Sequence, residues 1–160
     1  MGKRIKTNAL RILDKCKIEY EALHSDSVEG VVNGLAIVNK YGKNASLVFK
    51  TLVAHGVSKE LYVFIIPVLK ELDLKKAAHV TSEKKIEMLP HKDLNRYTGY
   101  VKGGCSPIGM KKLYRTFIDM DARKSDTIIV SGGKIGVQVE LKVSALCDVV
   151  HGEIANLHKN

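Results

Sequence analysis

The sequence predicts a single α+β domain, and three observations support this fold class. The chain has 160 residues, which is enough to build one hydrophobic core. Hydrophobic residues make up 45% of the chain and charged residues 27%, as in ordinary globular domains. Short β-rich runs alternate irregularly with amphipathic segments, without the repeated βαβ pattern of a doubly wound sheet. This arrangement favours an α+β or mixed-barrel domain.

Helices are predicted where apolar residues recur at helical spacing behind a capping residue. Thr7 or Asn8 can cap the first helix, Ser27 can cap the second, and Asp73 lies near the start of the third. The last predicted helix starts at Ser144 and continues past Gly152. In chain order, the predicted helices cover residues 8–16, 27–42, 70–79, 93–97 and 144 to beyond 152.

Strands are predicted where β-branched and aromatic residues form short apolar runs. The clearest signal is a pair of such runs, 46–54 and 61–66, on either side of a polar turn that contains Gly56. Two such runs across a short turn are typical of a hairpin. In chain order, the predicted strands cover residues 18–23, 46–54, 61–66, 85–88, 114–119, 127–130 and 137–141.

The net charge of +9 indicates a partner that carries negative charge. Such an excess attracts phosphate backbones or anionic membranes, so charge alone leaves the partner open. The longest apolar run, 61–69, is interrupted by Pro67 and is too short to span a bilayer, so we expect no membrane segment. The three cysteines form no CxxC pair, which favours a reducing, cytoplasmic compartment. The six histidines form no metal-binding spacing, so we expect neither a metal nor a cofactor.

Two glycine-rich segments are candidate ligand sites. Ser131-Gly132-Gly133-Lys134 fails the P-loop pattern, because Ile128 and Ile135 replace the required glycine and hydroxyl residue. It is either a tight turn between strands or a turn whose backbone N–H groups also hold a phosphate or carbonyl oxygen. In the loop 98–107, Gly103 and Gly104 can let a ligand approach the backbone closely, although most such loops are structural.

Three further features have both an ordinary and a functional interpretation. Lys50 interrupts an apolar strand, so it is either an edge lysine that faces solvent or a lysine that lines a cavity. Cys105 lies in the glycine loop, but nothing near it in sequence supports its activation as a nucleophile. A run of basic residues is either a solvated face or an RNA contact; it consists of Lys111, Lys112, Arg115, Arg123 and Lys124.

Four segments together resemble the YbaK/EbsC family. They are 48–53 (Val-Phe-Lys-Thr-Leu-Val), 72–76, 98–109 and 130–136 (Val-Ser-Gly-Gly-Lys-Ile-Gly), and the resemblance extends from about Thr7 to Ile154. This family includes bacterial Cys-tRNA(Pro) deacylases and is related to the editing domain inserted in bacterial prolyl-tRNA synthetases. The resemblance implies a six-stranded mixed β-barrel flanked by helices, in one domain over residues 1–160 with its core at about 7–154. It also implies a cytoplasmic enzyme without a metal.

The resemblance implies a pocket that holds the aminoacylated 3′ end of a tRNA. It implies catalytic roles for Lys50, Gly103 and Ser131. The residues expected to bind the substrate are Thr51, Gly104, Gly132, Gly133, Asp26 and Gln138. The residues expected to contact the tRNA are Lys111, Lys112, Arg115 and Lys134. The expected activity is removal of a mischarged amino acid, most directly Cys from tRNA(Pro), with prolyl-tRNA synthetase as a partner.

The sequence departs from the family pattern at three positions. Asp26 stands where related deacylases carry Tyr, and Ile135 and Gln138 replace an Arg and an Asp. The lysine and the glycines are retained while part of the pocket rim differs. Two alternative functions therefore stay open: a module that binds tRNA or an aminoacyl ligand without catalysis, and an enzyme that acts on a small nucleotide or sugar phosphate.

Overall fold

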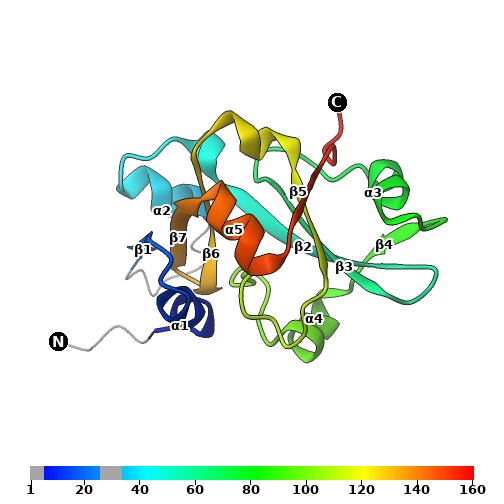
Figure 1. Ribbon diagram of the computed structural model, residues 1–160, viewed down its shortest axis with the longest axis horizontal. Coiled ribbons are helices and arrows are strands. Elements are labelled where there is room, and N and C mark those ends of the chain that lie inside the picture. Colours follow the sequence, from blue (N-terminus) through cyan, green and yellow to red (C-terminus); the bar gives the residue numbers. More distant parts are fainter. Residues whose placement is uncertain (1–5, 26–33) are drawn as a thin grey trace.

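The computed structural model describes residues 6–25 and 34–160, whose strands form two sheets (Figure 1). The smaller sheet is antiparallel, and its strand order is β1-β7-β6. The larger sheet is mixed, with order β4-β2-β3-β5-β8, because β5 pairs in parallel with both β3 and β8. In chain order the strands are β1 Tyr20–His24, β2 Phe49–Gly56, β3 Leu61–Pro67, β4 Ile86–Met88, β5 Arg115–Asp119, β6 Thr127–Lys134, β7 Val137–Lys142 and β8 Glu153–Ala155.

The helices begin where the sequence provides a cap or an exposed polar start. Thr7 caps α1 with its hydroxyl, which accepts from the Leu10 N–H at 3.1 Å, and Asp73 caps α3 through Lys75 N at 2.9 Å. The α-helices are α1 Asn8–Lys15, α2 Gly34–Lys40, α3 Leu74–Thr81, α4 His91–Thr98 and α5 Val143–Val150, and two 3₁₀ helices span Ala45–Leu47 (η1) and Met120–Lys124 (η2). Each described helix is too short or too polar to cross a lipid bilayer.

One large apolar cluster fills the space between the two sheets. It takes Phe49 and Val53 from β2, Val130 from β6 and Val139 from β7, and it extends to α1 and the loop after α4. The sheets meet at a single parallel bridge between Val48 and Ile129. The predicted α+β class is confirmed. The six-stranded barrel stays a prediction, because the described strands form two sheets and no closed barrel.

Two predictions about local structure are wrong. The segment 131–134 is not a turn: β6 continues through it to Lys134 with a bulge, and the turn to β7 is Ile135–Gly136. The last helix does not pass Gly152. It ends at Val150 because His151 adopts a left-handed conformation (φ 53°), and residues 153–155 pair with β5 as a strand. The predicted helix cap Ser27 lies outside the described residues.

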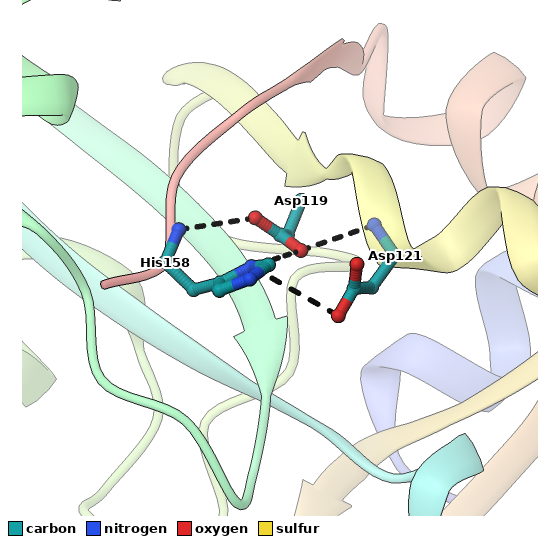
Figure 2. Close-up of side chains that lie close together, drawn as sticks. All are labelled: Asp119, Asp121 and His158. Atoms are coloured by element: carbon teal, nitrogen blue, oxygen red, sulfur yellow. Dashed lines mark hydrogen bonds and ion pairs between the residues drawn. The ribbon is translucent and has the colours of Figure 1, made fainter. Parts of the chain in front are cut away.

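The buried carboxylate of Asp119 holds the C-terminal segment against the larger sheet (Figure 2). One of its oxygens accepts from the backbone N–H groups of Leu157 (2.9 Å) and His158 (3.1 Å). The other accepts from Asp121 N (3.0 Å) and lies 2.8 Å from Nδ1 of the His158 ring. Four donors therefore surround one carboxylate that is fully shielded from solvent, as a buried charge requires.

We predict that Asp119→Asn lowers the free energy of unfolding by about 2–3 kcal/mol. An amide cannot accept from every donor that now surrounds the carboxylate, and lost bonds to a buried charged group cost this much. Urea unfolding of the variant measures the effect. The matched control is Asp148→Asn, an exposed residue on α5, which should change stability by less than about 0.5 kcal/mol. Equal stability of the two variants would contradict the role assigned to Asp119.

Candidate active site

The bridge between the sheets brings Lys50 and Ser131 to matching positions. Val48 and Ile129 pair in parallel, and both are buried against α2. Side chains alternate along a strand, so the residues two positions further on emerge on the same face. These residues are Lys50 on β2 and Ser131 on β6. The structure thus places the predicted catalytic lysine and serine on one face of neighbouring strands, on the side of α2.

Gln138 extends this face onto β7. It pairs with Ser131 on one side and with Leu23 of β1 on the other. Gln138 is 7% exposed. The Ser131 hydroxyl accepts from Gly133 N at 3.2 Å, which leaves its own proton free to donate. Lys50, Ser131 and Gln138 therefore present a cation, a hydroxyl and an amide on one face.

Thr51 lies on the opposite face of β2 from Lys50. It falls between Phe49 and Val53, whose side chains pack in the cluster between the sheets. Its hydroxyl oxygen is buried and has no hydrogen-bond partner in the described part of the chain. An unpartnered buried hydroxyl costs about 1–3 kcal/mol, so this one is a candidate for an interaction with a ligand or an ordered water.

The glycine loop after α4 packs against the tip of the β6–β7 hairpin. A Cβ at Gly104 would lie 2.8 Å from Ile135 N, so only glycine allows this approach. The loop is fixed by the Tyr100 hydroxyl, which donates to Ile108 O at 2.6 Å, and by Asn8, which donates to Gly109 O at 2.9 Å. The two glycine-rich segments that the sequence singled out are therefore in direct contact.

Gly103 is arranged as a backbone donor at the tip of this loop. Its φ of 86° is left-handed, a conformation that favours glycine. Its N–H has no acceptor among the described groups, whereas the N–H of Gly104 donates to Val101 O at 2.9 Å. On β6, the Gly132 carbonyl accepts from the Thr7 hydroxyl. A Cβ at Gly133 would lie 3.0 Å from the Tyr100 ring, so this glycine also serves close packing.

The predicted tRNA-contacting residues do not form one group. Lys111 and Lys112 are exposed at the base of the glycine loop, where Lys111 Nζ donates to Arg96 O at 3.2 Å. Lys134 is exposed at the hairpin tip, which contacts the same loop. Arg115 lies apart, at the far end of the larger sheet from Lys50. It stacks over Phe117 at 5.2 Å and pairs with Glu153 at 3.6 Å.

Asp26, which was predicted to bind the substrate, lies outside the described residues. Ser25 follows β1 and directly precedes Asp26 in the sequence. Its N–H donates to Gly136 O, in the β6–β7 turn, at 2.8 Å. The end of β1 therefore lies beside the turn of the hairpin that carries Ser131 and Gln138.

Cys105 is a poor candidate for a nucleophile. It is 7% exposed, and burial raises the pKa of its thiol to about 11. A thiol attacks as its thiolate, which is scarce at neutral pH when the pKa is so high. Cys105 packs in the large cluster with Tyr100 and Ile108, so its role in the loop is structural.

Among the described residues, one group of side chains could act as metal ligands, but lysine side chains already contact it. Asp119, Asp121 and His158 offer donor atoms within 4.8 Å of one another. Lys70 Nζ lies 3.1 Å from one oxygen of Asp121, and Lys124 Nζ lies 3.3 Å from the other. Burial opposes ionisation of Asp121, but the two lysines outweigh it and lower its pKa. This group has no recognisable sequence motif, because Asp119 and His158 lie 39 positions apart.

The aminoacyl-tRNA editing domain model matches residues 32–149, most of the chain. The "Putative Cys-tRNA(Pro)/Cys-tRNA(Cys) deacylase EbsC" of Enterococcus faecalis is 40% identical over 152 residues, covering 95% of this chain and 93% of that protein. The chain belongs to the aminoacyl-tRNA editing family. The family resemblance expected from the four motifs is thus confirmed, and the matched segment contains Lys50, Gly103, Ser131 and Gln138.

Solved structures share this fold at low sequence identity. A structure described as "a putative trans-editing enzyme for prolyl tRNA synthetase" superposes with a TM-score of 0.81 at 17% identity, covering 98% of this chain and 100% of that chain. The "hypothetical protein APE2540" superposes with a TM-score of 0.84 at 16% identity, covering 95% and 99%. The arrangement of the two sheets is therefore shared with proteins of very different sequence.

We predict that the cysteines of this editing domain differ sharply in reactivity. Cys16 is exposed, whereas Cys105 is buried with a pKa of about 11. Iodoacetamide at pH 7.5, followed by peptide mass spectrometry, should label Cys16 at least about 100-fold faster than Cys105. Unfolding in urea should remove the difference. Rapid native labelling of Cys105 would contradict its assignment as a packed, unreactive thiol.

Proposed function

We propose that this protein is a trans-editing aminoacyl-tRNA deacylase, which clears a mischarged amino acid from tRNA. The observation that carries the proposal is the placement of Lys50 and Ser131 at matching positions beyond the Val48–Ile129 bridge, in a chain of the editing family. The chemistry suits such a site. A synthetase rejects a similar amino acid by only about 1–3 kcal/mol, so a second hydrolytic site is needed for accuracy.

The proposed roles follow from where each group lies. Lys50 supplies positive charge near the ester or the terminal nucleotide. Gly103 supplies a backbone N–H that is free to bind the developing oxyanion, with Gly132 on β6 as the second candidate donor. Ser131 and Gln138 offer polar contacts to the aminoacyl group. An ester is already reactive, so placement and polarisation of its carbonyl supply much of the rate.

The residues around this centre complete the proposed pocket. Gly104 and Gly133 shape it by allowing the loop and hairpin to approach each other. Thr51 faces away from Lys50, so a substrate contact through its unpartnered hydroxyl would lie on the other side of β2. Asp26 is proposed as a rim residue. Lys111, Lys112 and Lys134 are proposed tRNA contacts around the glycine loop. Arg115, already engaged with Glu153, is proposed as a more distant contact.

The proposed substrate is Cys-tRNA(Pro), and the proposed attacking group is the substrate's own thiol. The sulfur bonds to the ester carbonyl carbon, the bond to the ribose oxygen breaks, and the thiol proton passes to that oxygen. No protein nucleophile is then required, which agrees with the burial of Cys105. We further propose a cytoplasmic protein that works beside prolyl-tRNA synthetase, and closure of the two sheets into the six-stranded barrel of the family.

We predict that Lys50→Ala lowers kcat for deacylation by about 10²–10³, because a positioned charge at the reacting group is lost. Release of labelled amino acid from charged tRNA measures the rate. Lys75→Ala removes an exposed lysine on α3 and should retain near-normal turnover. Circular dichroism and urea unfolding check that both variants are folded. Normal turnover by Lys50→Ala would exclude Lys50 from the site.

We predict that Cys-tRNA(Pro) is cleared much faster than Ala-tRNA(Pro) or Ser-tRNA(Pro), because only cysteine carries a thiol, with a pKa near 8.5. Cys105→Ala should stay active to within a few-fold. Equal rates for the three substrates would indicate that water, and not the substrate thiol, is the attacking group. Binding of tRNA without deacylation of any substrate would favour the binding module, a function consistent with an amide at Gln138 where related deacylases carry a carboxylate.

A further inference from the structure

A small cavity with both apolar and charged lining residues lies beside the proposed active site. Its volume is about 220 Å³, less than the roughly 300–1,000 Å³ of most small-molecule pockets, so it suits a single small group. It lies between η1, the end of β3 and η2. The residues that line it are Ala45, Ser46, Val48, Pro67, Leu69, Lys70, Asp121, Lys124 and Ser125.

Contacts with Asp121 and His158 orient Lys70 at the wall of this cavity. Asp119 lies 2.8 Å from Nδ1 of His158, which places the proton on that nitrogen and leaves Nε2 as an acceptor. Lys70 Nζ lies 3.4 Å from this Nε2 and 3.1 Å from Asp121. Figure 2 shows the three partners Asp119, Asp121 and His158 close together. These two contacts orient the ammonium of Lys70, whose side chain is 42% exposed.

The cavity offers more donors than acceptors. A lysine ammonium has three protons. Lys70 uses two of them and Lys124 uses one, so three stay available in the described structure. The hydroxyls of Ser46 and Ser125 have no partner among the described residues. Both oxygens of Asp121 are already paired with the lysines. Such a set of donors is matched to an anion with several oxygens, such as a phosphate group.

The cavity is also at the right place for a nucleic acid that enters the active site. Val48 lines it, and Lys50 follows two residues later on the same face of β2. Two strand residues span about 7 Å. A tRNA whose terminal adenosine lies at Lys50 would therefore carry its adjacent phosphates past the cavity mouth, where Lys124 is 73% exposed.

We propose that the cavity formed by Ser46, Lys70, Lys124 and Ser125 binds a backbone phosphate of the tRNA 3′ end, next to the terminal nucleotide. The proposal rests on the proposed function, since the direction of the RNA is set by the ester at Lys50. It assigns a defined role to Lys124, which the sequence showed only as part of a basic run, and adds Lys70 from outside that run.

The first test is the salt dependence of binding to uncharged tRNA(Pro). Each phosphate contact on a single strand contributes about 0.7 to the slope of log Kd against log salt. Lys124→Ala should lower the slope by about 0.7 and weaken binding by about 3- to 10-fold at 0.1 M salt. The control is Lys85→Ala, an exposed lysine (69%) that also pairs with one carboxylate, Glu87, at 3.0 Å. It should leave the slope unchanged and binding within about two-fold.

The second test separates the phosphate from the ester. For intact Cys-tRNA(Pro), Lys124→Ala should raise KM about 3- to 10-fold and leave kcat unchanged. For cysteinyl-adenosine, which has no phosphate, it should change neither constant. Lys124→Arg should restore KM for the intact tRNA, because the charge and its donors return. Lys70→Ala should reproduce the KM effect and, because it uncouples Asp121 and His158, should also lower stability.

The outcomes are distinguishable from failure of the proposed function. If wild-type protein deacylates neither substrate, the function is wrong, while the tRNA slopes still test the phosphate contact. If Lys124→Ala behaves like Lys85→Ala with intact tRNA, or raises KM equally for cysteinyl-adenosine, the phosphate site is wrong. If Lys124→Ala abolishes binding of inorganic phosphate but leaves the tRNA salt slope unchanged, the cavity takes a free anion instead of the RNA backbone, and the proposal also fails.

Discussion

The candidate site depends on the single parallel bridge between Val48 and Ile129. This bridge joins the two sheets where both residues are buried against α2. Because a strand alternates its side chains, the bridge fixes the face on which the next pairs emerge. A slip of one residue in this register would turn Lys50 into the core and carry Thr51 to the side of α2. The relation between lysine, serine and Gln138 is therefore a consequence of one backbone pairing.

Backbone contact between two glycine-rich segments supplies the other half of the site. Gly104 touches the backbone of the β6–β7 turn so closely that a Cβ would clash. The same contact leaves the N–H of Gly103 free at the loop tip while that of Gly104 is used internally. A loop that is held by its neighbours can present a donor without reorganising, which is the condition for effective stabilisation of an oxyanion.

The C-terminal segment links stability with the proposed phosphate cavity. Asp119 binds two backbone N–H groups of that segment and the ring of His158, and the ring in turn contacts Lys70. A buried carboxylate is costly unless every acceptor position is used, and here each oxygen has two donors. The same interactions that close the fold thus also set the position of a cation at the cavity beside β2.

The sequence by itself determined the fold class, the family and most element positions, because these depend on local patterns of apolar residues, caps and glycines. It could not show which side of its strand Lys50 faces, that β6 runs through Ser131 to Lys134, or that residues 153–155 form a strand, because pairing and packing with distant strands decide each. The group of Asp119, Asp121 and His158, with Lys70, was invisible for the same reason. Its members are up to 88 positions apart, and only the packing of the C-terminal segment on β5 brings their charges together.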